Sequence, residues 1–243
     1  MKTYVAILAA GKGLRMGLSQ PKQFEMLHGK TVLEHSVDTF EKHPNIDGIF
    51  VVVHEDFLEN TKRLLHVRNR PKIVGVIAGG AERMDSSYNA ILALENVDCN
   101  LLIHDAARPF VSEKIITDVV DALKIHSAVS VAIPATDTVY ICTDALRQAQ
   151  GPSAPAVIQS SPKRETVYLA QTPQGGRLSV LKNAFERMHA THVETGRAPS
   201  LQHIATDDAC VILHHLPNEK IHVVLGDVAN RKITFQSDLQ LKN

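Results

Sequence analysis

The first half of the chain alternates short apolar runs with segments whose apolar residues recur at helical spacing. The runs are rich in β-branched residues and predict buried strands at residues 4–9, 48–53, 73–77, 101–104 and 128–133. The segments between them predict helices at residues 32–40, 57–65, 86–94 and 115–125. Strands and helices in this order are joined by right-handed crossovers into a parallel sheet. We therefore predict an α/β fold with a Rossmann-like, doubly wound, mostly parallel sheet that binds ligands at the carboxyl ends of its strands.

The alternation stops after Pro134. Residues 135–166 lack a clear period and include a stretch rich in Gly, Pro and Ser. We predict a projecting β-arm there, with residues 138–142 and 167–171 paired as strands at its base. Farther along, the pattern predicts helices at 178–188 and 207–215 and a strand at 221–225. A chain of 243 residues is an ordinary size for one α/β domain, so we expect a single domain over 1–243.

Composition excludes several classes of protein. Lys plus Arg equals Asp plus Glu at 26 each, which argues against a partner with a nucleic-acid backbone. The three cysteines are far apart and odd in number, which favours a reducing compartment over a disulfide framework. No apolar run approaches the roughly 18 residues of a membrane span, and no signal peptide is evident. We expect a cytoplasmic protein without a membrane segment.

A glycine loop follows the first predicted strand. It reads Ala9-Ala10-Gly11-Lys12-Gly13-Leu14-Arg15-Met16-Gly17, and Pro21-Lys22-Gln23-Phe24 comes shortly afterwards. Gly11 and Gly13 let the backbone approach a bulky anion, while Arg15 and Lys22 add two positive charges. These features suit a triphosphate, and the alternative is a tight turn with solvated basic side chains. The loop lacks the Gly-Lys-Ser/Thr of a P-loop and the third glycine of the dinucleotide fingerprint.

Asp105 is the candidate metal ligand because it follows the predicted strand at 101–104, at the edge of the sheet where ligands bind. Mg²⁺ prefers carboxylate oxygens and keeps several waters, so one Asp together with substrate phosphates makes a sufficient site. The alternative role for Asp105 is a turn or helix cap. We interpret His104 as a packing or hydrogen-bonding residue and not as a catalyst.

Further motifs occur in order along almost the whole chain. They are Gly79-Gly80-Ala81-Glu82-Arg83, His104-Asp105-Ala106-Ala107-Arg108-Pro109, Asp137-Thr138, Gln171-Thr172-Pro173-Gln174 and Thr206-Asp207-Asp208-Ala209. With the glycine loop and Pro-Lys-Gln-Phe, they resemble the signature of sugar nucleotidyltransferases, in the branch that acts on polyol phosphates. The pattern is most similar to the 2-C-methyl-D-erythritol 4-phosphate cytidylyltransferase family of the non-mevalonate isoprenoid pathway. The ribitol-5-phosphate cytidylyltransferases share much of it and remain an alternative.

The resemblance implies a role for each matching residue. It implies nucleotide contacts at Ala10, Gly11, Gly13, Gly80 and Ser86, and acceptor contacts at Asp105, Arg108, Thr138, Arg164 and Thr206. It implies catalytic roles for Arg15, Lys22 and Lys232. CTP and a polyol phosphate are the implied substrates, Mg²⁺ is the implied cofactor, and the arm is expected to complete the site of a neighbouring subunit in a homodimer. Taken alone, Asp85, Ser86 or Thr206 also suits a helix cap, and Arg108 or Arg164 also suits a surface charge.

The implied reaction is an in-line displacement in which the acceptor's phosphate oxygen attacks the α-phosphorus of CTP. An ionised phosphate is already a nucleophile, so cations matter more than a general base. Two other classes stay open: a non-catalytic nucleotide-binding module, and a dinucleotide-dependent oxidoreductase. The oxidoreductase is disfavoured because a third glycine is missing and His54, not an acidic residue, closes the second strand.

Overall fold

The computed structural model describes residues 1–11, 20–66, 70–142, 157–195 and 206–240. Its centre is a seven-stranded sheet in the order β11-β7-β10-β6-β1-β4-β5. The strands are β1 (Lys2–Ala9), β4 (Gly48–Val53), β5 (Ile73–Ala78), β6 (Cys99–Asp105), β7 (Ala128–Pro134), β10 (Tyr168–Arg177) and β11 (Ile221–Leu225). All neighbouring pairs are parallel except those that β10 makes with β6 and β7. The predicted doubly wound, mostly parallel sheet is confirmed.

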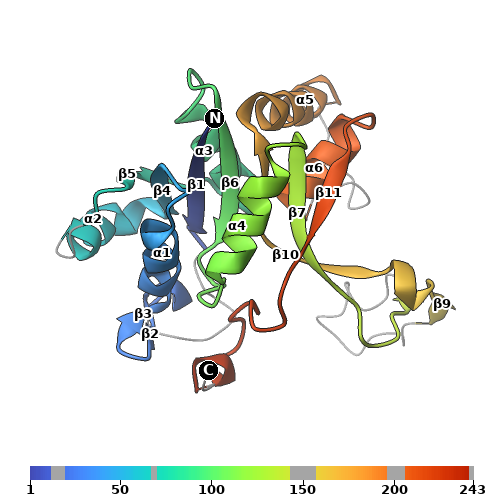
Figure 1. Cartoon of the computed structure of the whole chain (residues 1–243), viewed down its shortest axis with the longest axis horizontal. Helices are drawn as coiled ribbons and strands as arrows, with labels where there is room; N and C mark the ends of the chain where they lie inside the picture. The colour runs from blue at the N-terminus through green and yellow to red at the C-terminus, as the bar shows by residue number, and fades with distance from the viewer. Residues whose placement is uncertain (12–19, 67–69, 143–156, 196–205, 241–243) are drawn as a thin grey trace.

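Helices cover both faces of this sheet (Figure 1). They are α1 (Val32–Lys42), α2 (Leu58–His66), α3 (Arg83–Leu92), α4 (Glu113–Ala122), α5 (Leu178–Thr195) and α6 (Asp208–His215). Val5 and Ile7 of β1 join the apolar cluster under α1 and α4, whereas Ala6 and Leu8 join the cluster under α3, α5 and α6. Successive strand residues point to opposite faces, so this fully apolar strand supplies two cores at once.

Side chains at the helix starts explain where several helices begin. Thr31 and Glu34 form a capping box at α1, with Thr31 Oγ1 accepting from the Glu34 N–H at 3.2 Å and Glu34 Oε2 accepting from the Thr31 N–H at 2.9 Å. Asp207 caps α6 by accepting from the Cys210 N–H at 2.8 Å. Each cap satisfies backbone donors that the helix itself leaves without partners.

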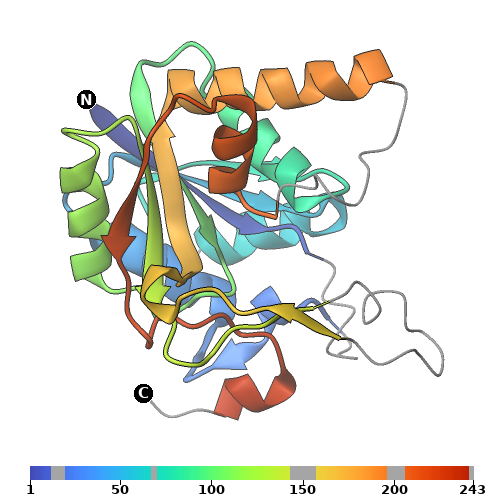
Figure 2. The same cartoon turned by 90° about the vertical axis from the view of Figure 1, so that its right-hand side faces the viewer.

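The arm leaves the sheet after β7 and returns into β10, and Figure 2 shows it extending beyond the sheet. The predicted pairing at its base is wrong. Strand β8 (Ile141–Cys142) pairs with β9 (Ile158–Ser160), while Tyr168–Ala170 in β10 pairs with the end of β7. The residues after 167 enter the main sheet directly, so their backbone groups are already used there. The Gly- and Pro-rich tip at 143–156 lies outside the described residues.

The other predicted elements match the observed ones to within three residues at each end, except that α5 ends at Thr195 and not at residue 188. The largest shift at a helix start is at α3, which begins at Arg83 instead of residue 86. Two short two-residue strands, β2 (Met26–Leu27) and β3 (Lys30–Thr31), form a separate hairpin. Within the described ranges, no helix combines the length and apolar character that crossing a bilayer requires.

Candidate active site

Loops from three parallel strands meet at one edge of the sheet. Leu8 of β1 lies beside Asp105 of β6, and the Ala106 N–H donates to the Leu8 carbonyl at 3.0 Å. After β5, Gly79 lies against the start of the glycine loop, since a Cβ on Gly79 would come within 2.4 Å of the Ala10 Cβ. A larger residue at position 79 would push these loops apart. The topology therefore brings Ala10, Gly79 and Asp105 to the same edge, as predicted.

Gln23 fixes the start of the glycine loop from the other side. Its buried side-chain amide donates to the carbonyl of Ala9 at 2.7 Å and to the carbonyl of Gly11 at 3.0 Å. Both carbonyls are thereby satisfied by one side chain. Gly11 itself is exposed, and an added Cβ there would meet no atom within 4 Å. The backbone at Gly11 is thus open to a ligand.

A cluster of four charged side chains surrounds the end of β6. Asp105 Oδ2 lies 2.6 Å from Lys232 Nζ, and Asp105 Oδ1 accepts from Arg83 Nε at 3.1 Å. Arg83 also reaches Asp208, with Nη2 lying 2.8 Å from Asp208 Oδ2. The side chains of Asp105 and Asp208 are 12% and 1% exposed, whereas that of Lys232 is 43% exposed. The cluster is therefore buried on the Arg83 side and open on the Lys232 side.

The cations of this cluster keep Asp105 ionised. Burial alone would raise the pKa of Asp105, but the charges of Arg83 and Lys232 outweigh it and hold the pKa well below its usual range. Burial would lower the pKa of Arg83, yet the neighbouring Asp208 and Asp105 raise it above its ordinary value. The site therefore presents a permanently charged carboxylate, which suits a hard cation or an ammonium group.

Hydrogen bonds behind Asp105 fix its backbone. Thr172 Oγ1 accepts from the Asp105 N–H at 3.1 Å and lies 3.0 Å from His104 Nδ1. His104 Nε2 lies 3.2 Å from the carbonyl of Arg108, so Nε2 carries the proton and Nδ1 accepts from Thr172. Burial lowers the pKa of His104 to about 4, which keeps this neutral tautomer. His104 is thus a hydrogen-bonding residue of the interior, as predicted.

The segment 226–235 gathers the other basic residues. Arg108 donates through Nη1 to the carbonyl of Asn230 at 2.8 Å, and Lys22 Nζ donates to the carbonyl of Ile233 at 2.7 Å. Asn230 is fully buried and donates to Gln171 Oε1 and to the carbonyl of Thr172. Lys22, Arg108 and Lys232 come from three distant parts of the sequence, and all three are held on this segment, where Lys232 also pairs with Asp105.

Comparison with known proteins identifies the family. Residues 3–243 match the family model described as 2-C-methyl-D-erythritol 4-phosphate cytidylyltransferase. The chain belongs to this family. The resemblance inferred from the motifs is confirmed.

Individual relatives agree with this assignment. The 2-C-methyl-D-erythritol 4-phosphate cytidylyltransferase of Thermobifida fusca (strain YX) is 40% identical over 96% of this chain and 89% of that protein. The bifunctional ribulose 5-phosphate reductase/CDP-ribitol pyrophosphorylase Bcs1 of Haemophilus influenzae is 36% identical over 96% of this chain, which spans 46% of that protein. The crystal structure of 4-diphosphocytidyl-2C-methyl-D-erythritol synthase from Anaerococcus prevotii DSM 20548 superposes with a TM-score of 0.79, at 29% identity, over 98% of this chain and 93% of that one.

The residues expected to contact the base form a closed turn. Ser86 is buried, and its hydroxyl accepts from the Gly80 N–H at 3.1 Å and donates to the carbonyl of Glu82 at 3.2 Å. The helix cap is Glu82, not Asp85 or Ser86, and Asp85 Oδ2 accepts from the Glu82 N–H at 2.9 Å. The position of the expected cap was therefore wrong, because this Glu82–Asp85 contact starts α3 earlier than the apolar spacing shows.

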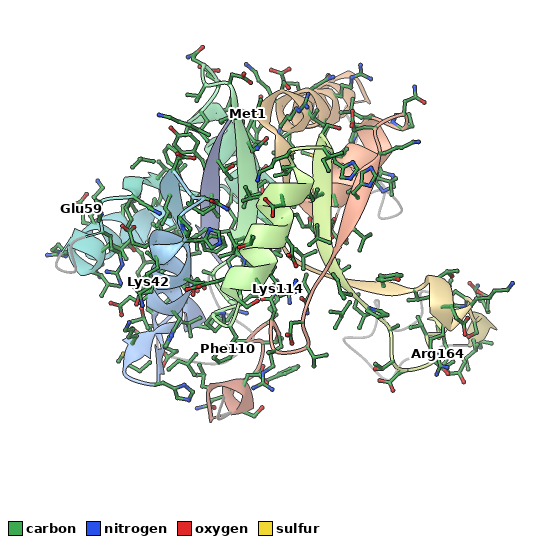
Figure 3. The ribbon with its side chains drawn as sticks, in the orientation of Figure 1. Met1, Lys42, Glu59, Phe110, Lys114 and Arg164 are labelled. Carbon is green, nitrogen blue, oxygen red and sulfur yellow. The ribbon has the colours of Figure 1, made fainter. Side chains whose placement is uncertain are left out.

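The remaining predicted residues are spread more widely. Thr206 is exposed and precedes the Asp207 cap, so Thr206 is not the cap of α6. Thr138 and Arg164 are exposed on the arm, and Figure 3 shows Arg164 far from Phe110 at the end of the sheet. Among the described residues, the hydrogen bonds of the Asp105 side chain go to Arg83 and Lys232, and neither Thr138 nor Arg164 is one of its partners. Gly13 and Arg15 lie outside the described residues.

Several residues of the centre were not singled out by sequence reasoning. They are Gln23, Arg83, Thr172, Asp208 and Asn230. All but Asn230 stand inside motifs that carried the family resemblance, which was the available signal. What the sequence alone did not show is that some of their side chains contact one another, since Arg83 and Asp208 form an ion pair from positions about half the chain length apart.

Proposed function

We propose that this chain transfers the cytidylyl group of CTP to 2-C-methyl-D-erythritol 4-phosphate, giving CDP-methylerythritol and pyrophosphate. Family membership over residues 3–243 and the 40% identical Thermobifida relative support this activity. The structural observation that carries the proposal is the Lys232–Asp105 ion pair at the end of β6. It unites a basic residue from the C-terminal segment with the expected metal-binding carboxylate at the edge of the sheet.

The chemistry requires one bond to form and one to break at the α-phosphorus. An oxygen of the acceptor's phosphate attacks this phosphorus, and the bond to the bridging oxygen of pyrophosphate breaks. Both reactants are anions, so the protein must offset their repulsion and the charge of the transition state. We assign this to Arg15, Lys22 and Lys232. No group of the chain needs to remove a proton.

Lys22 and Arg108 donate to backbone carbonyls in this structure. A phosphate is a stronger acceptor than a carbonyl for a cationic donor, so substrate can draw these side chains from Ile233 and Asn230. We assign Lys22 to the triphosphate and Arg108 to the phosphate of the acceptor. Ala10, Gly11, Gly13, Gly80 and Ser86 are assigned to the nucleotide, with the exposed backbone of Gly11 as the part open to phosphates.

The donor groups fit a magnesium ion that is shared with substrate. Among the described residues, no group of three or more His, Cys, Asp or Glu side chains is arranged to hold a metal. Asp105 nevertheless offers an ionised carboxylate, and Mg²⁺ is commonly bound by one or two carboxylates together with substrate phosphates and water. Asp105 would hold the ion, which supplies positive charge against the phosphates when bound.

We further propose that the arm completes the centre of a second copy of the chain. Thr138 and Arg164 are expected at the acceptor, yet both are exposed on the arm. The arm also exposes apolar side chains, with Tyr140, Ile141, Val157 and Ile158 each more than half exposed. Exposed apolar side chains gathered on one projection are typical of an interface. A homodimer accounts for both observations.

The three cysteines are free, which supports a reducing cytoplasmic setting.

The second candidate acceptor is ribitol 5-phosphate. The 36% identity to a bifunctional protein named for CDP-ribitol pyrophosphorylase activity supports it. Both acceptors carry a phosphate and hydroxyl groups, so the contacts they need from Arg108 and Thr206 are similar.

Release of pyrophosphate tests the proposal. The protein is incubated with CTP and Mg²⁺ and either acceptor, with a matched reaction that lacks acceptor. We expect release that depends on the acceptor and is fastest with methylerythritol phosphate. Faster turnover of ribitol phosphate would select the second candidate, and no release with either would favour a non-catalytic nucleotide-binding module.

A further inference from the structure

Arg83 contacts both carboxylates of the charged cluster, Asp105 and Asp208, and is not among the residues assigned to the substrates. It is the first residue of α3, and its side chain is 27% exposed. Nε donates to Asp105 Oδ1 at 3.1 Å, and Nη2 lies 2.8 Å from Asp208 Oδ2. One guanidinium thus joins the end of β6 to the first turn of α6.

The two carboxylates belong to separate segments of the expected site. Asp105 is the expected metal ligand and is also an expected contact of the acceptor. Asp208 follows Thr206, the residue expected at the acceptor, with Asp207 between them. The start of α6 is also tied to β10, because Gln174 donates to Asp207 Oδ2 at 2.9 Å and accepts from the Ala209 N–H at 3.0 Å. Arg83 adds the link that runs from α6 to Asp105.

The link lies mostly in the interior, with the side chain of Arg83 27% exposed. Asp208 is 1% exposed, and Arg83 is the cation paired with it within the described ranges. Asp105 uses its other oxygen for Lys232, which leaves Arg83 on the interior side of the carboxylate and Lys232 on the open side. A planar guanidinium holds two carboxylates in a fixed relation that an ammonium group does not reproduce.

We propose that Arg83 is a positioning residue that sets the Thr206 segment relative to Asp105, and so holds the acceptor in line with the nucleotide. This inference rests on the proposed function. Arg83 acts through Asp105 and Asp208 and needs no contact with substrate. Replacing a residue that orients the direct ligands of a centre commonly lowers the activity about 10- to 100-fold.

A purely structural role is the competing explanation. Removing Arg83 leaves the buried Asp208 without its countercharge, which destabilises a protein whatever the residue does for catalysis. The double variant R83Q/D208N separates the two roles, because it removes both charges and therefore most of this penalty. A structural role predicts that the double variant regains both stability and turnover, whereas a positioning role predicts that it regains stability alone.

The experiment compares R83Q, D208N and the double variant with R63Q as the matched control. Arg63 is exposed on α2, where it donates to Asn60. Urea unfolding gives stability, and pyrophosphate release at varied CTP and varied acceptor gives kcat and both KM values. We expect R83Q and the double variant to lose about 10- to 100-fold in turnover, with the acceptor KM rising more than the CTP KM, while R63Q matches the wild type.

Each outcome decides the question. If R83Q does not fold, the double variant and D208N carry the test. Turnover of the double variant close to that of the wild type overturns the inference, as does an equal rise in both KM values. Wild-type protein that releases no pyrophosphate overturns the proposed function and this inference with it. An active wild type whose double variant is stable and slow supports both.

Discussion

The centre at the end of the sheet and the projecting arm handle charge and apolar surface in opposite ways. At the centre, Arg83, Asp105 and Asp208 are mostly buried and paired within one chain. On the arm, Arg164 and the apolar Ile158 are exposed. Folding of one chain therefore assembles the cationic centre, whereas it leaves these side chains of the arm exposed. Variants at the centre and on the arm are therefore expected to differ in kind.

The largest effect is expected at Lys22. Changing Lys22 to Ala should cost about 2–4 kcal/mol of transition-state stabilisation, because one preorganised cation at the phosphates is lost. We expect folding to change little, because losing a hydrogen bond such as that from Lys22 Nζ to the carbonyl of Ile233 costs only about 1 kcal/mol. Kinetics of pyrophosphate release together with urea unfolding measure both quantities. Lys62→Ala, on the exposed side of α2, is the control, and near-normal turnover of Lys22→Ala would contradict the role.

We expect the free energy of unfolding to depend on pH through His104, a buried residue of the centre that has no counterpart on the arm. Burial lowers the pKa of His104 to about 4 from its ordinary 6.5. Between these values the unfolded chain binds more protons than the folded one, so the stability contributed by His104 is complete above 6.5 and is lost as the pH falls toward 4. The loss is on the order of 3 kcal/mol. His104→Asn should flatten the pH dependence of urea unfolding, and unchanged dependence would sink this explanation.

Replacing Gly79 with Ala tests the packing of the centre with a smaller change. The added Cβ would come within 2.4 Å of the Ala10 Cβ, so the two loops must move apart. We expect a loss of about 1–3 kcal/mol in the free energy of unfolding and a rise in the KM for CTP. Gly11→Ala is the matched control for the free energy of unfolding, because an added Cβ at Gly11 meets nothing within 4 Å. Equal destabilisation of the two variants would argue against close packing at Gly79.

The smallest effect on folding is expected on the arm. Ile158→Asp should change the free energy of unfolding by no more than about 0.5 kcal/mol, because the side chain is exposed. It should nevertheless convert a dimer to a monomer and lower activity. Sedimentation analysis of the variant is compared with Ile125→Asp, an exposed residue of the main body. A wild type that sediments as a monomer at all concentrations would refute the proposed role of the arm.

The two regions also differ in how far the sequence predicts them. The strands and helices of the first half follow from apolar periodicity, because a strand buried on both faces such as β1 is apolar throughout. The strand pairing within the arm cannot be predicted in this way. Ile141–Cys142 pairs with Ile158–Ser160, and no local pattern distinguishes this pairing from the one expected with residues 167–171. Short exposed strands lack the burial that fixes register.

Within the centre, the types of residue were predictable and their contacts were not. Asp105 was predicted from the end of its strand, Lys22 from its charge beside the glycine loop, and Arg108 and Lys232 from the resemblance. The Arg83–Asp208 contact depends on how α3 and α6 pack on the sheet, which periodicity does not specify. The same holds for Thr172, whose hydroxyl serves both Asp105 and His104 from a strand far along the chain.

A crystal structure with bound CTP and Mg²⁺ is the decisive test of the proposed site. We expect the triphosphate beside the backbone of Gly11 and the metal ion on Asp105, with Lys22 turned from Ile233 to the phosphates. A triphosphate bound elsewhere, with Lys232 still paired to Asp105 and no metal ion at that carboxylate, would contradict it.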